Sequence, residues 1–389
     1  WGTSMEFRKN VATEFVMGAG ALQLVGRYAR NFAAQKVLLV TDPGLVAAGW
    51  VAKVVEALTQ ADVPSVVFSD VSPNPREVEV MVGARLFQDS GCDLIVALGG
   101  GSPMDCAKGI GIVATSGEDI LSFEGVDKVC VPGPPLICIP TTAGTAADVS
   151  QFAIINDTAR HVKIAIISKA MVPDAALIDP RTTTTMPADL TAATGIDALV
   201  HAIEAYVSTA SSPVTDLHAL EAVRLISTNL VQAIQNPDEM RYRDAMMLAS
   251  LLAGLAFSNA SLGLVHAMAH SLGGLLDLPH GVCNALLLEY VVEFNHAGAP
   301  ERYAALAKAF GVNVDSLPVD EQKKHFIEDL FALRMAFGLG QGLGQLGVKK
   351  ESIPTLARYA SSDPCVATNP VKPGVQDIEW IYERALAPR

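Results

Sequence analysis

The sequence is poor in charged residues, and the charge that it carries is mainly negative. Asp, Glu, Lys and Arg make up 18% of its 389 residues, and 28 basic against 41 acidic side chains give a formal net charge of −13. Nucleic acids and anionic membranes reward clustered Lys and Arg, whereas the basic residues here form only short pairs such as Lys323-Lys324. We therefore expect neither a nucleic acid nor a membrane among the partners.

Paired cysteines and long apolar segments are also lacking. The six cysteines are scattered without a C-x-x-C pair, which is typical of a reduced, intracellular protein. No apolar run reaches the ~18 uninterrupted residues of a membrane helix; the nearest, Ala245 to Met268, is broken by polar side chains and predicts a buried pair of helices. Residues 1–4 lack the basic-then-apolar pattern of a signal peptide and are left out of the predicted domains. These observations predict a soluble cytoplasmic protein.

Half of the residues are hydrophobic, and in the first half of the chain they form short runs separated by helical patterns near residues 45–60 and 77–89. The runs are Val37 to Thr41, Ser65 to Phe68, Asp93 to Leu98 and Leu136 to Ile139. Continuous apolar strands that alternate with helices predict a parallel sheet covered on both faces. Residues 151–156 and 163–168 flank a polar turn and predict a hairpin.

The second half of the chain has helical periodicity. Apolar residues recur three and four apart over residues 190–206, 215–235, 243–257 and 301–310. Because the chain is also longer than one typical core, we predict two domains: a Rossmann-like α/β dinucleotide-binding domain with a parallel sheet at residues 5–184, and an all-α, metal- and substrate-binding domain at 185–389. The site is expected in the cleft between them.

A glycine-rich turn follows the apolar run at residues 93–98. Gly99-Gly100-Gly101-Ser102 leads at once into a helical stretch beginning near Pro103, a residue that the first turn of a helix tolerates. Glycines let a ligand approach the backbone, and the free N–H groups of a new helix suit a pyrophosphate. The alternative is a tight turn without a ligand, and the motif is not the G-x-G-x-x-G fingerprint.

Two further strand ends carry polar side chains that suit a nucleotide. Thr141, Thr142 and Thr145 follow the run at 136–139, where their hydroxyls can bind phosphate or ribose oxygens, or cap a helix instead. Asp42 ends the first strand, where a carboxylate can bind an adenosine ribose and repel a 2′-phosphate, although turn chemistry in Asp-Pro-Gly explains it too. Loops of this kind at several strand ends favour a dinucleotide.

An aspartate and four histidines occur in three motifs within apolar helical stretches. Asp197 and His201 are four residues apart and therefore share one helix face. His266 and His270 repeat this spacing, and His280 follows in a Pro-His-Gly motif. One histidine on an apolar face is usually a core residue, but this many beside a carboxylate, in a poor solvent for charge, are better explained by coordination of a cation.

The types of donor restrict the cation. Imidazoles with one carboxylate suit Fe(II) or Zn(II) and disfavour Mg(II) and Ca(II), which prefer oxygen ligands. The H-E-x-x-H pattern of zinc proteases is absent. Spacing alone leaves open whether both His266 and His270 bind the cation.

With these motifs the sequence resembles the iron-containing (group III) alcohol dehydrogenase family almost from end to end. The matching stretches are Thr41-Asp42, Pro73-Asn74-Pro75, Gly99 to Lys108, Pro140 to Thr145, Gly195 to Tyr206, and His266 to Gly281. Two variants, at residues 144–148 and 256–259, are similar to the propanediol oxidoreductase (lactaldehyde reductase) branch.

The resemblance implies an enzyme that transfers a hydride between NAD(H) and a small primary alcohol or aldehyde. It implies one cation, Fe(II) with Zn(II) as the alternative, held by Asp197, His201, His266 and His280, and it implies that His270 lies beside the nicotinamide and the substrate without binding the cation. We predict that His270 is catalytic and relays a proton to solvent. The implied cofactor contacts are Asp42, Asn74, Gly99, Gly100, Gly101, Ser102, Asp105, Thr141, Thr142, Thr145 and Lys163. Members of the family are usually homodimers or larger homo-oligomers.

Two departures from the family pattern concern the surroundings of the site. Many relatives have Gly-Ser-Glu where this chain has Ala146-Ala147-Asp148, and Asn369-Pro370-Val371 replaces the common Asn-Pro-Arg, with Lys372 as a candidate substitute for the lost guanidinium.

Phe152, Phe257 and Cys365 are our predictions for the substrate pocket, with ordinary packing as the alternative for each. Two other functions are also compatible with the sequence: a zinc-dependent polyol dehydrogenase similar to glycerol dehydrogenase, and a non-catalytic scaffold or assembly subunit. The sequence does not define which alcohol or aldehyde is the substrate, or the direction of the reaction.

Overall fold

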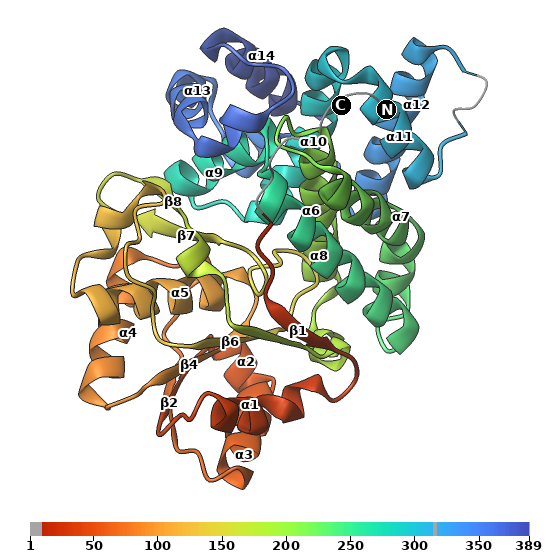
Figure 1. Ribbon diagram of the computed structural model, residues 1–389. Helices are drawn as coiled ribbons and strands as arrows, with labels where there is room; N and C mark the ends of the chain where they lie inside the picture. Colours follow the sequence, from red (N-terminus) through yellow and green to blue (C-terminus); the bar gives the residue numbers. More distant parts are fainter. Residues whose placement is uncertain (1–9, 314–316, 389) are drawn as a thin grey trace.

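The computed structural model describes residues 10–313 and 317–388, so the predicted domain start at residue 5 lies outside the described residues. The N-terminal half contains a six-stranded sheet in the order β1-β9-β6-β4-β2-β3, in which every neighbouring pair is parallel (Figure 1). Its strands are β1 (Glu14–Met17), β2 (Val37–Val40), β3 (Ser65–Phe68), β4 (Leu94–Gly99), β6 (Leu136–Pro140) and β9 (Ala175–Ile178).

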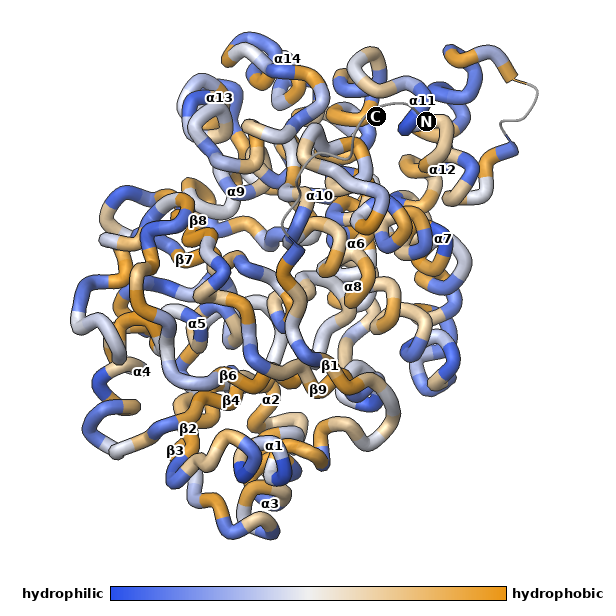
Figure 2. Tube along the Cα trace, viewed as in Figure 1, coloured by the Kyte–Doolittle hydropathy of each residue, from blue (hydrophilic) through white to orange (hydrophobic). Residues whose placement is uncertain are grey.

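Helices cover both faces of this sheet because its strands are apolar on both sides. Alternate residues of β2 and β4, such as Leu38 and Ile95, pack against α4 and α5, whereas Leu39 and Val96 face α1 and α3. Figure 2 shows the hydrophobic band along these strands. The helices are α1 (Val25–Asn31), α2 (Pro43–Ala47), α3 (Trp50–Gln60), α4 (Glu77–Asp89) and α5 (Gly101–Ser116). The predicted parallel sheet with helices on both faces is confirmed.

Two local predictions were wrong or incomplete. The single helix predicted near residues 45–60 is two helices, α2 and α3, because Gly49 adopts a left-handed conformation (φ 81°) between them. The edge strand β1 and the short strand β9 were not predicted. Both have only four residues, and β9 includes two alanines, so neither carries a strong strand pattern.

The predicted hairpin is confirmed as β7 (Phe152–Asp157) and β8 (Val162–Ile167), which pair antiparallel. Asp157 stabilises the turn by accepting hydrogen bonds from the backbone N–H groups of Ala159 and Arg160. β5 (Gly125–Val126) adds a parallel strand to β8, which completes a second, three-stranded sheet. This small sheet contacts α5 through β7 and α9 through β8, so it joins the N-terminal half to the helical half.

The rest of the described chain is helical, as predicted (Figure 1, green to blue). Its helices are α6 (Ala188–Val207), α7 (Pro213–Gln235), α8 (Met240–Ala260), α9 (Leu264–Leu276), α10 (His280–Asn295), α11 (Pro300–Phe310), α12 (Val319–Ala336), α13 (Ile353–Ser362) and α14 (Val375–Leu386). α6 is buried along almost its entire length between α7, α8 and α10.

Within the described residues, no single helix is long and apolar enough to cross a membrane. The helices α8 and α9 meet the length and composition test only as a pair, and they are bent by 98° relative to each other. Most residues of both helices are buried, so the predicted buried helix pair is confirmed.

Candidate metal and cofactor site

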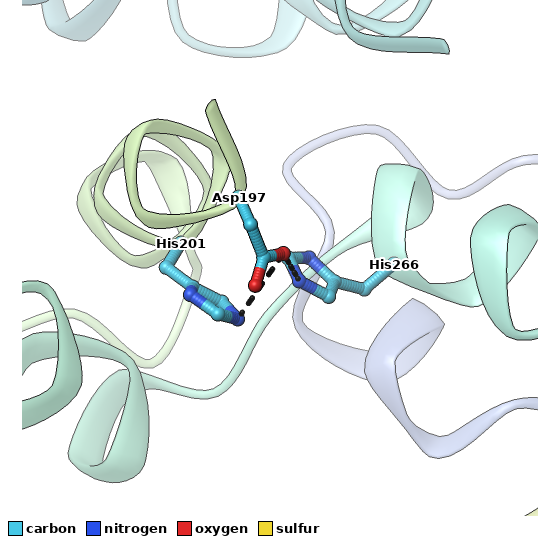
Figure 3. A group of neighbouring side chains, drawn as sticks. All are labelled: Asp197, His201 and His266. Carbon is cyan, nitrogen blue, oxygen red and sulfur yellow. Dashed lines mark ion pairs between the residues drawn. The ribbon is translucent and has the colours of Figure 1, made fainter. Parts of the chain in front are cut away.

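Four predicted ligand side chains from three helices lie together. Oδ1 of Asp197 lies 3.9 Å from Nε2 of His201, 3.6 Å from Nε2 of His266 and 3.6 Å from Nε2 of His280. Figure 3 shows the rings of His201 and His266 turned toward the Asp197 carboxylate. Asp197, His201 and His266 each offer a donor atom within 4.8 Å of the others, which fits one transition-metal ion with bonds of about 2 Å to each donor. His280 joins this group through its contact with Asp197.

The helices bring these donors together for identifiable local reasons. Asp197 and His201 are one turn apart on α6, which is buried on all sides. His280 is the first residue of α10, and Gly281 beside it allows α10 to approach α6 closely: a Cβ at Gly281 would lie 2.5 Å from the carbonyl oxygen of Ala193. A larger residue at this position would move His280 away from Asp197.

The outer nitrogens of two imidazoles are held by acceptors. Nδ1 of His266 lies 2.6 Å from Oε2 of Glu204, and Nδ1 of His201 lies 3.3 Å from the carbonyl oxygen of Gly144. A proton on Nδ1 satisfies both contacts and leaves the lone pair on Nε2, the nitrogen that faces Asp197. Such partners fix the tautomer and orientation of metal-binding histidines.

The electrostatics of the group favour a cation. Burial acts to raise the pKa of Asp197, but the three surrounding histidines outweigh it and hold that pKa well below its usual range. Burial, with smaller contributions from His266 and His270, outweighs the Asp197 carboxylate and lowers the pKa of His201 to about 4. Burial acts to lower the pKa of His266, but the carboxylates of Asp197 and Glu204 outweigh it and raise that pKa to about 9. At neutral pH the Asp197 carboxylate is therefore ionised and His266 beside it is protonated, a positive charge that a bound metal ion would replace.

Asn284, one turn after His280 on α10, contacts most of this group. Its fully buried amide Nδ2 donates to Oδ1 of Asp197 at 2.7 Å and lies 3.3 Å from Nε2 of His266 and 3.2 Å from Nε2 of His280. The amide therefore keeps the Asp197 carboxylate turned toward the histidines.

Two adjoining cavities lie between the helical half and the sheet. The larger, of about 890 Å³, extends along the ends of the strands, and the smaller, of about 130 Å³, extends over the histidines. Both are lined by Asn74, Gly101, Ser102, Thr145, Asp197 and His280. The candidate metal ligands thus face the glycine-rich turn across one continuous space.

Most predicted cofactor residues line this space. Those on the larger cavity are Asp42, Asn74, Gly100, Gly101, Ser102, Thr141, Thr142 and Thr145, and Asp105 and Lys163 line the smaller one. Gly99 ends β4 just before the turn and lines neither cavity. A Cβ on Gly100 would lie 3.0 Å from the Thr142 side chain, so glycine also lets the two loops approach each other.

The position of Asp42 is compatible with both roles considered for it. Its Oδ1 accepts a hydrogen bond from the backbone N–H of Leu45 at 3.1 Å and so caps α2. The same residue lines the larger cavity. The turn and a possible ribose contact are therefore compatible.

A chain of hydrogen bonds crosses the cleft beside the smaller cavity. Nζ of Lys163, on β8, donates to Oδ1 of Asn74 at 2.6 Å, and Nδ2 of Asn74 donates to Oδ1 of Asp277 at 2.7 Å. Asp277 is the residue that ends α9. Asn74 and Asp277 both have left-handed backbones (φ 59° and 52°), which Asn and Asp tolerate best after glycine. The loop that contains Asn74 and the end of α9 are thus directly linked.

Two of the three predicted pocket residues line the smaller cavity. Phe257 stacks on the His201 ring with centroids 4.3 Å apart, and Phe152 meets Phe257 edge-on at 5.7 Å. Cys365 does not line either cavity: it is fully buried, and its backbone N–H donates to Asp363 at 2.8 Å. The structure therefore gives no support to Cys365 as a pocket residue.

The two departures from the family pattern, at residues 146–148 and 369–371, lie in different parts of the structure. Ala147 lines the smaller cavity, whereas Asp148 is buried and burial raises its pKa to about 6. Asn369 retains buried hydrogen bonds with Leu264 and Asn295. Lys372 is exposed and lines neither cavity, so it does not replace a guanidinium there.

Three residues of the site were not found from the sequence: Glu204, Asn284 and Asp363. Glu204 had a signal, because it follows Asp197 and His201 at a helical spacing within an apolar stretch. Asn284 is one turn after His280, which is a weaker signal of the same kind. Asp363 had none, because its partner, His270, is distant in sequence.

Known proteins match this chain along nearly its whole length. The iron-containing alcohol dehydrogenase profile matches residues 12–180, and the profile for the C-terminal part of the Fe-containing alcohol dehydrogenase family matches residues 191–386. The chain is 43% identical to 1,3-propanediol dehydrogenase of Citrobacter freundii, over 95% of this chain and 96% of that protein. It is 39% identical to the NAD-dependent methanol dehydrogenase of Bacillus methanolicus, over 95% and 96%.

A crystal structure of 1,3-propanediol oxidoreductase has the same fold. It superposes with a TM-score of 0.95 at 41% identity, covering 98% of this chain and all of that one. The chain belongs to the iron-containing alcohol dehydrogenase family. The resemblance predicted from the motifs is confirmed, and within the family the chain is similar to the propanediol branch.

Proposed function

We propose that this protein is an NAD-dependent alcohol dehydrogenase that interconverts small primary alcohols and aldehydes, with Fe(II) held by Asp197, His201, His266 and His280. The observation that carries the proposal is the cavity in which this donor set faces the glycine-rich turn. A nucleotide on the turn and a small oxygen-containing substrate at the donors would be neighbours in that space.

The residues present fit a divalent transition metal. The Nε2 atoms of three imidazoles lie 3.6–3.9 Å from Oδ1 of Asp197, and two of these imidazoles have their Nδ1 atoms held by acceptors on the outer side. Fe(II) would supply a Lewis acid for the substrate oxygen, and NAD(H) would exchange the hydride. The same donors accept Zn(II), which keeps a zinc-dependent polyol dehydrogenase as the second candidate.

NAD, rather than NADP, is favoured by Asp42. Its carboxylate lines the larger cavity at the end of β2, where it can bind ribose hydroxyls and would repel a 2′-phosphate. The loops with Gly100, Ser102 and Thr142 would hold the phosphates. The similarity to an NAD-dependent methanol dehydrogenase supports the same cofactor.

The remaining residues of the smaller cavity orient the substrate and handle protons. Phe152 and Phe257 give it an apolar wall, which suits a short carbon chain and excludes water. His270 lines the same cavity and is our candidate for exchanging a proton between the substrate side and solvent.

We also propose two domains, residues 5–184 and 185–389, and a cytoplasmic homodimer or larger homo-oligomer without nucleic acid. The last strand of the large sheet, β9, ends at Ile178 and α6 begins at Ala188, which supports a boundary in between. The cysteines are free, which agrees with a reducing compartment.

The test is an anaerobic panel of short alcohols and aldehydes, with the protein reconstituted with Fe(II) or Zn(II) and NADH absorbance as the readout. Turnover of ethanol, 1,2- or 1,3-propanediol, or lactaldehyde, together with about one metal ion per chain, is the expected result. Turnover restricted to glycerol with Zn(II) would favour the polyol dehydrogenase. Binding of metal and NAD without turnover of any substrate would favour a non-catalytic subunit.

A further inference from the structure

A second buried pair, Asp363 and His270, lies beside the candidate metal centre. Oδ2 of Asp363 is 2.8 Å from Nδ1 of His270, and both side chains are less than a tenth exposed. His270 lines the smaller cavity, but Asp363 does not. The carboxylate therefore contacts the imidazole from outside the cavity.

The Asp363 carboxylate is held in place from more than one direction. It caps the short 3₁₀ helix η8 (Pro364–Thr368): its Oδ1 accepts a hydrogen bond from the backbone N–H of Cys365 at 2.8 Å, and the Cys365 thiol bonds it as well. Burial acts to raise the pKa of Asp363, but His270 and these hydrogen bonds outweigh it and lower that pKa. Asp363 is therefore an ionised, fixed acceptor.

The group His270, Asp363 and Cys365 has donor types that also occur in metal sites. Its geometry favours a hydrogen-bonded pair instead. Nδ1 of His270 and Oδ2 of Asp363 are at hydrogen-bond distance. Each atom is therefore engaged with the other and is not free to coordinate a metal ion. Burial raises the pKa of the Cys365 thiol well above its usual value, so the thiolate that a metal would require is disfavoured.

We propose that Asp363 is a positioning residue that fixes His270 as the Nδ1–H tautomer and turns its Nε2 lone pair toward the smaller cavity. Nε2 can then take a proton from the substrate side of the cavity and return it to water, while the Nδ1 proton stays on the imidazole. A carboxylate that orients a proton-transferring imidazole is a recurrent arrangement in enzymes. This inference rests on the proposed function, because alcohol oxidation supplies the proton that His270 would transfer.

The first test measures the tautomer directly and does not require turnover. Protein labelled with ¹⁵N-histidine and loaded with Zn(II), which is diamagnetic, should show His270 with a protonated Nδ1 and an unprotonated Nε2, the signal being assigned with the variant His270→Gln. Asp363→Asn should lose this single tautomer, because an amide can donate to Nδ1 as well as accept from it. Asp363→Glu, which keeps a carboxylate, should restore it. A wild-type protein with the proton on Nε2, or an unchanged tautomer in Asp363→Asn, would overturn the proposal.

The second test separates positioning from a structural role. With NAD and 1,3-propanediol, Asp363→Asn should lower kcat about 100-fold, the lower end of what a positioned proton-transferring group contributes, with KM for both substrates and the metal content within about twofold of wild type. Asp119→Asn is the matched control, because Asp119 caps the 3₁₀ helix η2 (Ile120–Phe123) through the same type of contact, to Leu121 N–H at 2.9 Å, without a histidine partner. Its kcat should be unchanged.

Each alternative has its own outcome. Binding of two metal ions per chain, one of them lost in Asp363→Asn, would identify a second metal site and overturn the proposal. If Asp119→Asn lost as much kcat as Asp363→Asn, the effect of Asp363 would be explained by the loss of a helix cap. That result would also overturn the proposal. If the wild-type protein turns over none of the alcohols or aldehydes, the proposed function fails, and the tautomer measurement still decides the role of Asp363.

Discussion

Oε2 of Glu204 lies 2.6 Å from Nδ1 of His266, and the same carboxylate accepts hydrogen bonds from the backbone N–H groups of Gly263 and Val265. One side chain of α6 therefore orients a candidate ligand and also anchors the start of α9, the helix that carries it. The loss of this carboxylate should affect the metal site before it affects the fold.

Glu204→Gln keeps the size of the side chain and removes its charge. We expect the affinity for Zn(II) to fall 10–100-fold, as is typical when a partner of a metal-binding histidine is changed. Competition with a chelator at fixed pH measures this. Glu289→Gln is the control, because Glu289 is also a buried glutamate but pairs with Arg334 and lines neither cavity. That variant should lower the melting temperature and leave the affinity unchanged; equal losses of affinity would contradict the assigned role of Glu204.

Removal of the metal should destabilise the protein without unfolding it at room temperature. A ligand that binds only the folded state stabilises it by about 2.7 kcal/mol at a hundred times its Kd, so chelation should lower the melting temperature and added Zn(II) should restore it. In Asp197→Ala and His280→Ala this response and the activity should both disappear, while the circular dichroism spectrum is kept. Normal metal occupancy in either variant would show that the ligand assignment is wrong.

Asp42→Ser separates the two roles of Asp42. Serine still caps a helix, so α2 should remain intact, but the charge that would repel a 2′-phosphate is gone. We expect kcat/KM with NADP to rise relative to that with NAD, and a melting temperature close to that of wild type. Asp42→Gly should change the preference in the same direction. An unchanged ratio of the two specificity constants would contradict a contact between Asp42 and the adenosine ribose.

Asp277→Gly removes the acceptor of the hydrogen bond from Asn74. Glycine adopts the left-handed backbone of this position without strain, so the change removes the contact across the cleft more cleanly than alanine would. We expect KM for NAD to rise several-fold while the metal content stays constant, because Asn74 is then held only by Lys163. Asp277→Asn, which can keep the hydrogen bond through its amide oxygen, should behave like wild type. A KM unaffected by Asp277→Gly would show that the contact does not order the cofactor side.

The sequence predicted those parts of the site that depend on local periodicity. Asp197 and His201 share a helix face by spacing alone, and the glycine-rich turn follows a strand that is apolar throughout, so both could be located before the fold was known. The break between α2 and α3 was missed because it depends on the backbone angle of one residue, Gly49, within an otherwise helical pattern.

Contacts between segments that are distant in the sequence could not be predicted from local sequence patterns. The role of His270 came from the family resemblance, and its partner Asp363 became visible only once α9 and η8 were packed together. Cys365 was predicted for the pocket because it is near the predicted site in the family pattern, but its backbone contacts Asp363 and its side chain is buried. Proximity in sequence to a site residue did not give the direction of the side chain.

The origin of the candidate ligands from three helices has a consequence for how the protein matures. Asp197 is on α6, His266 on α9 and His280 on α10, and the carbonyl that holds His201 belongs to Gly144, in the loop after β6. During synthesis the donors leave the ribosome one after another, and the set is complete only after α10 has packed against α6. The complete donor set therefore depends on tertiary packing, so we expect tight metal binding only by chains in which α6, α9 and α10 have already packed together.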